Sequence, residues 1–148
     1  MSKIIEGLYL GSVDDCTNTD WLYNNKISVI FNVAIELYCI NIKFNDNKKI
    51  TCISCPMYDS PNQSLMKCIY MAIPLIRRCI AENKNILVHC YAGISRSASI
   101  VIAFLMNYYK LSFINSYQYV KSKRNIINPN SGFIFQLKEY ENEIMNIQ

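Results

Sequence analysis

The segment from Asn85 to Tyr109 constrains the fold of this chain more than any other stretch. Its first residues, Asn85–Val88, form a short β-branched and leucine run bounded by polar residues, which is typical of a strand buried on both faces. A mostly apolar run from Ala98 to Tyr109 follows and predicts a long buried helix. The segment therefore predicts a buried strand that turns sharply into a buried helix.

The turn between these two elements, His89 to Ser97, is predicted to bind an anion. Several backbone N–H groups at a helix start have no intrahelical partner, and the helix dipole adds positive potential there. Gly93 allows backbone conformations that a Cβ would block, so that successive N–H groups can face inward. Arg96 adds a planar fork of donors that matches two phosphate oxygens. Cys90 would then lie at the centre of these inward-facing N–H groups. The helix dipole and Arg96 would stabilise a thiolate there.

The sequence His-Cys-Tyr-Ala-Gly-Ile-Ser-Arg-Ser at 89–97 resembles the signature of the cysteine-dependent protein tyrosine phosphatases. From Ala92 onward it most resembles the dual-specificity branch, which acts on phosphotyrosine and on phosphoserine or phosphothreonine. No appended kinase-docking domain fits within 148 residues, so the chain resembles the small atypical type. A Walker-type loop needs Gly-Lys-Ser/Thr and a nucleophile elbow needs Gly-x-Ser-x-Gly, and the sequence contains neither motif.

The resemblance assigns a role to each residue of this turn. Cys90 is implied to be the nucleophile, and Arg96 is implied to bind the phosphate. The hydroxyl of Ser97 is implied to hydrogen-bond the cysteine sulfur and help it leave, although a residue in this place could merely cap the helix. His89 is implied to order the loop and support the thiolate. The loop N–H groups that complete the phosphate site belong to Tyr91, Ala92, Gly93, Ile94, Ser95 and Arg96.

Asp59 is the predicted general acid. It lies in a loop after a predicted strand, Lys49–Cys55, and the loop is restrained by Pro56 and Pro61. Phosphoryl transfer from an ester needs a proton for the leaving oxygen, and a carboxylic acid on a nearby loop can supply it. A surface loop can also hold an aspartate as an ordinary turn residue. In the dual-specificity family the acid is an aspartate shortly after a strand and well before the nucleophile, so the resemblance assigns this role to Asp59.

The resemblance covers nearly the whole chain, from Gly7 to about Ile144. Its last part, Asn128–Phe133, is similar to the Asn/Ser-Pro-Asn turn that precedes the closing helix of the family, and it places Asn130 as a supporting residue of the site. The implied fold is α/β, with a central, mostly parallel twisted sheet flanked by helices on both faces and the site at the carboxyl end of the central strand. Residues 1–148 are long enough for one core and too short for two, which predicts a single catalytic domain.

The remaining elements follow from periodicity and turn signals. Ile4–Leu10 is expected to form two short strands that meet at a bend at Gly7. Pro74 is expected to kink or break a helix over 64–82. The segment 34–49 is expected to be a loop, with a short edge strand considered at Tyr38–Ile42. Further expected elements are a short helix capped by Ser12, a helix over 21–25 capped by Thr19 and Asp20, a strand over 27–33, and helices over 113–121 and 133–145.

Cysteine and histidine usage argues against a metal site. The seven cysteines are odd in number and irregularly spaced, which predicts reduced thiols. Cys52 and Cys55 form a Cys-x-x-Cys, but positions three apart on a strand face opposite sides, so core cysteines are predicted rather than a metal or dithiol site. A disulfide between one of them and Cys90 under oxidation stays open. His89 is the only histidine, and no metal or cofactor is predicted.

Charge and hydropathy limit the partners. The net charge of +4 is spread along the chain, so a nucleic-acid partner is not expected. The short basic cluster Lys121–Arg124 is predicted to be a solvated helix end, with direct substrate contact as the alternative. The sequence contains no run of about 18 apolar residues and no apolar leader, so we expect neither a membrane span nor a signal peptide. The predicted location is therefore the cytoplasm, and also the nucleus, and no membrane partner is expected. The oligomeric state is left open.

The predicted function is hydrolysis of phosphotyrosine and phosphoserine or phosphothreonine in proteins through a phosphocysteine intermediate. A shallow pocket is expected, because the chain lacks a counterpart of the segment with which tyrosine-specific relatives build a deep slot. The alternatives are an RNA 5′-triphosphatase, a phosphoinositide phosphatase and a catalytically dead phosphate-binding module. Lipid-directed relatives tend to carry lysines in the loop, RNA triphosphatases usually carry His-Cys-Thr-His-Gly-x-Asn-Arg-Thr, and dead modules lose the cysteine, arginine or acid; this sequence shows none of these marks.

Overall fold

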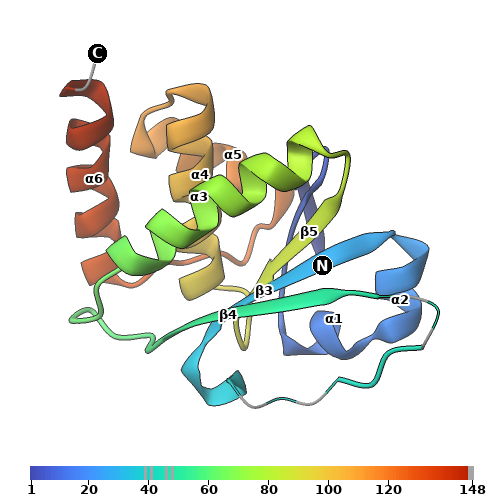
Figure 1. The fold of residues 1–148 in the computed structure, drawn as a ribbon. Coiled ribbons are helices and arrows are strands. Elements are labelled where there is room, and N and C mark those ends of the chain that lie inside the picture. Colours follow the sequence, from blue (N-terminus) through green and yellow to red (C-terminus); the bar gives the residue numbers. More distant parts are fainter. Residues whose placement is uncertain (39, 41, 46, 48, 147–148) are drawn as a thin grey trace.

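A five-stranded sheet forms the centre of the computed structural model, which describes residues 1–38, 40, 42–45, 47 and 49–146 (Figure 1). Its strand order is β1-β2-β5-β3-β4. β1 runs antiparallel to β2, and all other neighbouring strands are parallel. The strands are β1 (Ser2–Ile5), β2 (Leu8–Gly11), β3 (Ile27–Ala34), β4 (Thr51–Met57) and β5 (Asn85–His89). The predicted α/β fold with a mostly parallel sheet is confirmed.

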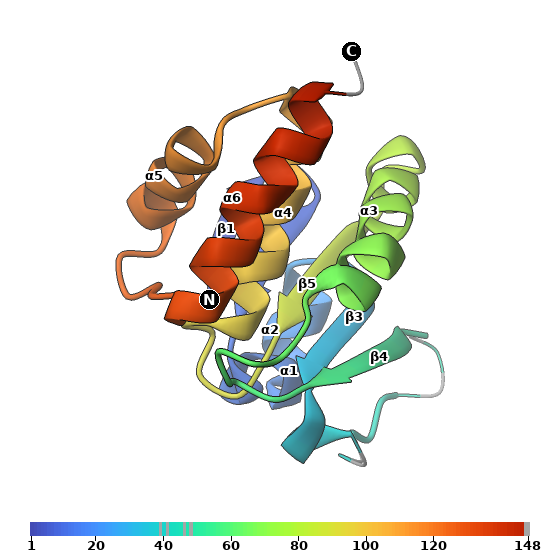
Figure 2. The ribbon, with the colours of Figure 1, turned by 90° about the vertical axis from the view of Figure 1, so that its left-hand side faces the viewer.

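Helices cover both faces of this sheet. Figures 1 and 2 show α3 (Met66–Ala81), α4 (Arg96–Tyr109), α5 (Phe113–Lys123) and α6 (Ser131–Asn146) on one side. The short helices α1 (Val13–Thr17) and α2 (Thr19–Asn24) lie on the other side. α4 lies among the larger helices, and every residue from Arg96 to Met106 is buried. A short 3-10 helix, η1 (Ile35–Leu37), follows β3.

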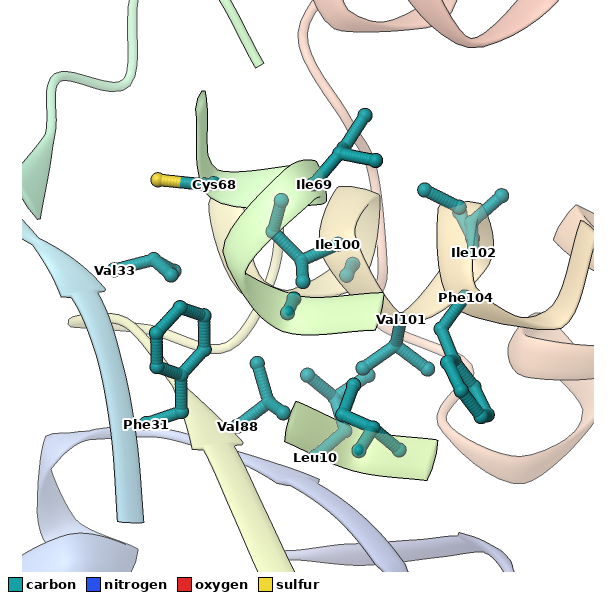
Figure 3. Packing of buried hydrophobic residues seen from close by; sticks show 14 of the residues in the cluster. Leu10, Phe31, Val33, Cys68, Ile69, Val88, Ile100, Val101, Ile102 and Phe104 are labelled. Atoms are coloured by element: carbon teal, nitrogen blue, oxygen red, sulfur yellow. The ribbon is translucent and has the colours of Figure 1, made fainter. Parts of the chain in front are cut away.

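The core explains why β5 has a continuous apolar run. Successive side chains of a strand point to opposite faces, so a strand between two helical layers is apolar at every position. On the face toward α3 and α4, Leu10, Phe31 and Val88 pack with Ile100 and Val101 of α4 (Figure 3). On the opposite face a smaller buried cluster contains Tyr9, Cys16, Leu22, Ile27, Ile30 and Leu87. The rigid centre of the molecule therefore lies directly behind the loop that joins β5 to α4.

The amino-terminal elements agree closely with the sequence patterns. Gly7 has φ 89° at the bend between β1 and β2, in the left-handed region that favours glycine. Ser12 caps α1 as predicted, in a capping box with Asp15. The cap of α2 is Asn18, whose side chain accepts a hydrogen bond from the backbone N–H of Trp21. The prediction that Thr19 and Asp20 cap this helix was therefore wrong, because a short polar side chain was available just before them.

α3 differs from expectation because it continues through Pro74. Proline removes one N–H donor from the helix interior, but the buried residues on either side, Ala72 and Ile76, keep this face packed on the core. Pro74 therefore does not end the helix, and a kink at this residue stays a prediction. The edge strand considered at Tyr38–Ile42 includes residues 39 and 41, which lie outside the described residues. Within the described part of the chain, no helix is both long and apolar enough to cross a membrane.

Candidate active site

The loop between β5 and α4 surrounds the sulfur of Cys90 with hydrogen-bond donors. Cys90 is buried, and its Sγ accepts a hydrogen bond from the backbone N–H of Gly93 at 3.2 Å. The Oγ of Ser97, in the first turn of α4, lies 3.1 Å from the same sulfur. Both groups would stabilise negative charge on the sulfur, because each can direct an N–H or O–H at it. The site lies at the carboxyl end of β5, between β2 and β3 of the sheet.

Gly93 is required by the shape of this loop. Its φ is 68°, which non-glycine residues rarely adopt. A Cβ at this position would lie 2.7 Å from the carbonyl oxygen of Gly11 and 2.6 Å from Nη2 of Arg124. Backbone conformation and close packing therefore select glycine independently.

Arg96 is held so that one edge of its guanidinium remains available. Nη1 donates to Oε2 of Glu36 at 2.6 Å and to the carbonyl oxygen of Met57 at 3.1 Å, and Nη2 donates to Oε1 of Glu36. A guanidinium carries five N–H donors, so the Nε–H and one Nη2–H remain, and these two lie side by side. Arg96 is only 7% exposed, and its Nε has no partner within the described residues. A buried unpaired donor is costly, and two oxygens of an anion would satisfy this pair.

The pair between Glu36 and Arg96 is ionised. The hydrogen bond from Arg96 holds the pKa of the Glu36 carboxyl below its usual value. Burial acts to lower the pKa of Arg96, but the hydrogen bond to Glu36 and the neighbouring negative charges outweigh it, so that this pKa is raised. Both side chains are thus charged at neutral pH, and each fixes the orientation of the other.

Glu36 is the residue of this site that the sequence analysis missed. It lies in η1, shortly after the end of β3. The carboxyl ends of parallel strands meet at one edge of a sheet, so an acidic residue just after β3 is expected near the loop after β5. This topological signal was present in the sequence, but the segment was interpreted only as a loop.

Asp59 is brought to the loop through Asn130. It is exposed in the segment that follows β4, and its Oδ1 accepts a hydrogen bond from Nδ2 of Asn130 at 2.9 Å. The backbone N–H of Asn130 donates to Oγ of Ser95 at 3.0 Å, and its Oδ1 accepts from the N–H of Phe133. Asn130 therefore joins the segment of Asp59, the loop from Cys90 to Arg96 and the start of α6.

His89 is the last residue of β5 and directly precedes Cys90. It is 1% exposed, and its Nδ1 lies 3.2 Å from the carbonyl oxygen of Cys90, a contact in which the ring N–H donates. Burial lowers the pKa of His89, so the ring is neutral at neutral pH. A neutral ring fixes the loop backbone without adding charge, as a structural support would.

The chain is similar to known proteins over most of its length. The family model described as "Dual specificity phosphatase, catalytic domain" matches residues 8–143. The chain belongs to this family. It is 35% identical over 141 residues to human dual specificity protein phosphatase 22, with 95% of this chain and 73% of that protein covered. It is 33% identical to Drosophila melanogaster dual specificity protein phosphatase MPK-4, covering 93% of this chain but only 35% of that protein.

A solved structure agrees in fold. The human tyrosine phosphatase-like serine/threonine/tyrosine-interacting protein superposes with a TM-score of 0.88 at 30% identity, covering 98% of this chain and 97% of that chain. The family and the class of hydrolase predicted from the sequence, the dual-specificity protein phosphatases, are confirmed.

The basic cluster of this phosphatase domain differs from its prediction. Lys123 is exposed, with Nζ 5.5 Å from the centre of the Tyr119 ring, as a solvated helix end would be. Lys121 instead donates to the carbonyl oxygen of Ile127 at 2.9 Å. Arg124 turns back onto the loop and donates from Nε to the carbonyl oxygen of Gly93 at 2.9 Å. The prediction of a solvated cluster was thus wrong for these last two residues, because backbone carbonyls compete with water for their donors.

The cysteines of β4 in this phosphatase domain face opposite sides. Cys52 is exposed, whereas Cys55 is buried, with its Sγ 2.6 Å from that of Cys68. Burial raises the pKa of Cys68, which favours the thiol over the reactive thiolate. In the ranges that the structure describes, no group of three His, Cys, Asp or Glu could hold a metal ion.

Proposed function

We propose that this chain hydrolyses phosphate esters of tyrosine and of serine or threonine in proteins, with Cys90 as the nucleophile. The observation that carries the proposal is the arrangement of Arg96. Its ion pair with Glu36 uses one edge of the guanidinium, and the buried Nε–H beside the Cys90 loop is left for another acceptor. A bound phosphate supplies two oxygens to this edge and places phosphorus in front of the sulfur.

In the first step the thiolate of Cys90 attacks phosphorus. The S–P bond forms while the P–O bond to the substrate breaks, and Asp59 donates its proton to the departing oxygen. The N–H groups of the loop and Arg96 stabilise the charge on the equatorial oxygens. The N–H of Gly93 and the Oγ of Ser97 stabilise the thiolate before attack.

In the second step water attacks the phosphocysteine. Asp59, now a carboxylate, takes a proton from the water, the S–P bond breaks, and inorganic phosphate leaves. The hydroxyl of Ser97 donates to the departing sulfur, which its distance of 3.1 Å allows. The residues thus return to their starting protonation states without a metal or cofactor.

The proposal of a protein substrate is supported by the family and by the exposure of residues in the Cys90 loop and in the segment of Asp59. Tyr58, Asp59, Tyr91 and Ala92 are all exposed, so these residues are accessible to another protein that carries a phosphorylated side chain. The chain spans only part of some relatives, so substrates selected by further domains are outside this proposal. We expect action in the cytoplasm or nucleus, where Cys90 stays reduced.

The test is phosphate release from matched phosphotyrosyl and phosphothreonyl peptides, with reductant and without metal. Wild-type protein is compared with the Cys90→Ser variant, which retains the shape of the loop. We expect wild type to hydrolyse both peptides, and the variant to lose more than about 10⁴-fold in turnover while still binding them.

Near-normal turnover by Cys90→Ser contradicts the mechanism. Hydrolysis of RNA 5′-triphosphate or a phosphoinositide, but of neither peptide, contradicts the protein substrate. Binding of peptides without hydrolysis by wild type favours a binding module, a role to which the word "interacting" in the name of one structural neighbour also points.

A further inference from the structure

Arg124 contacts the back of the anion-binding loop from outside. It follows α5 directly, and its Nε donates to the carbonyl oxygen of Gly93 at 2.9 Å. Its Nη2 donates to the carbonyl oxygen of Ala92 at 3.3 Å, and its Nη1 donates to Oγ of Ser2 at 3.3 Å. All three nitrogens of the guanidinium are therefore used on protein atoms, two of them on consecutive loop carbonyls.

The two carbonyls need such a partner because of how the loop must be shaped. When successive N–H groups face inward toward an anion, the carbonyls of the same peptide units are turned outward. Gly93 is buried, so its outward carbonyl requires a partner from the protein. A cationic donor makes this hydrogen bond stronger than a neutral group would.

The residues after Arg124 continue along the loop. The N–H of Asn128 donates to the carbonyl oxygen of Ile94 at 2.8 Å, and the N–H of Asn130 donates to Oγ of Ser95. The segment 124–130 thus contacts four consecutive residues of the loop, 92–95. Among these contacts to the loop, only those of Arg124 are made by a charged side chain.

We propose that Arg124 is a positioning residue of the phosphatase site. Its guanidinium holds the carbonyls of Ala92 and Gly93 away from the anion, so that the N–H groups of the loop stay directed at it. The inference rests on the proposed function for its catalytic consequence, but not for its effect on anion binding. It also assigns Arg124 a role different from direct substrate contact, because each nitrogen of its guanidinium already donates to a protein atom.

The test measures the dissociation constant of inorganic phosphate by calorimetry, with kcat/KM for a phosphotyrosyl peptide alongside. Arg124→Gln removes the charge and replaces the guanidinium fork with a shorter neutral amide, which cannot donate to both carbonyls at once. Arg124→Lys keeps the charge but provides a point donor that cannot hold both carbonyls in a fork. Lys123→Gln is the matched control. It also removes one positive charge, and Lys123 is the exposed residue that directly precedes Arg124.

We expect Arg124→Gln to weaken phosphate binding by about ten-fold, which is about 1.4 kcal/mol, because the charge-assisted hydrogen bond to the loop is lost. Arg124→Lys should weaken it by about three-fold, because one charged donor remains. Lys123→Gln is expected to bind phosphate like wild type. The value of kcat/KM should fall by the same factors for the peptide and for a small aryl phosphate, since the defect lies in the loop. The binding measurements are made well below the melting temperature of each variant.

Unchanged phosphate binding by Arg124→Gln overturns the proposal. If that variant does not fold, wild-type phosphate binding by Arg124→Lys overturns it instead. If Arg124→Gln and Lys123→Gln lose phosphate affinity equally, the effect is one of net charge and the proposal is overturned. If kcat/KM falls for the peptide but not for the aryl phosphate, Arg124 contacts the substrate and the proposal is overturned as well. If wild type binds phosphate but hydrolyses no ester, the proposed function fails while the binding test of Arg124 still decides this inference.

Discussion

The loop from Cys90 to Arg96 and the segment from Tyr58 to Ser64 meet at one site but are held in different ways. The loop is largely buried, is joined directly to β5 and α4, and makes backbone contacts to α1 and to the segment 124–130. The segment from Tyr58 to Ser64 is mostly exposed, and Asp59 is linked to the loop by hydrogen bonds through one residue, Asn130. In the proposed mechanism, anion binding is thus built on the rigid core, whereas proton transfer depends on a surface segment.

This difference has a functional consequence. Changes in the loop should reduce anion binding and turnover together, because both use the same donors. Changes around Asp59 should reduce turnover and leave anion binding intact. The following variants test the separation.

Arg96→Lys should have the largest effect of the variants in this series. Lysine has no second edge with which to bind a phosphate while it pairs with Glu36, so both orientation and bidentate binding are lost. We expect kcat/KM to fall by about 10³-fold and phosphate binding to weaken in parallel, measured by steady-state kinetics and calorimetry. A fall in kcat/KM with unchanged phosphate binding would contradict the expectation that changes in the loop reduce turnover and anion binding together.

Asp59→Asn should slow only the esters that need a proton on their leaving oxygen. We expect about a 100-fold fall in kcat for a phosphothreonyl peptide and a much smaller fall for an aryl phosphate whose phenol is acidic. Phosphate binding should match wild type. Equal losses with both kinds of ester would show that Asp59 does not act as the acid.

Asn130→Ala should have a smaller effect in the same direction. It removes the hydrogen bond to Asp59 and the side-chain cap of α6, so the acid is less often in place. We expect kcat for the phosphothreonyl peptide to fall by about five-fold. The double variant with Asp59→Asn should be no slower than Asp59→Asn alone, and additive losses would argue that Asn130 acts by another route.

The smallest effect concerns stability and the buried ring of His89. Because burial lowers its folded-state pKa from the ordinary value of 6.5, the unfolded chain binds a proton that the folded chain does not. The free energy of unfolding should therefore fall as pH drops below about 6.5, by at most about 1.4 kcal/mol per pH unit. Urea denaturation of wild type and His89→Asn between about pH 7.5 and pH 5.5 measures this, and identical slopes would contradict it.

The same contrast explains how much the sequence could predict. The strand, loop and helix around Cys90 are contiguous, so apolar periodicity, Gly93 and Arg96 together indicated both the fold and an anion site. Glu36 and Arg124 could not be assigned in this way, because their contacts join segments far apart in the chain and depend on which strand ends lie together. Asp59 and Asn130 were named only through resemblance to a family, since neither lies in a locally distinctive pattern.

The most direct test of this account is to look for phosphate bound covalently to Cys90. In a Ser97→Ala variant the sulfur loses the hydroxyl 3.1 Å away, so the second step should slow more than the first and the intermediate should accumulate. Rapid acid quenching during turnover of a phosphotyrosyl peptide, followed by peptide mapping, should find phosphate on Cys90. Turnover at a measurable rate with no phosphate on Cys90 at any quench time would contradict the mechanism.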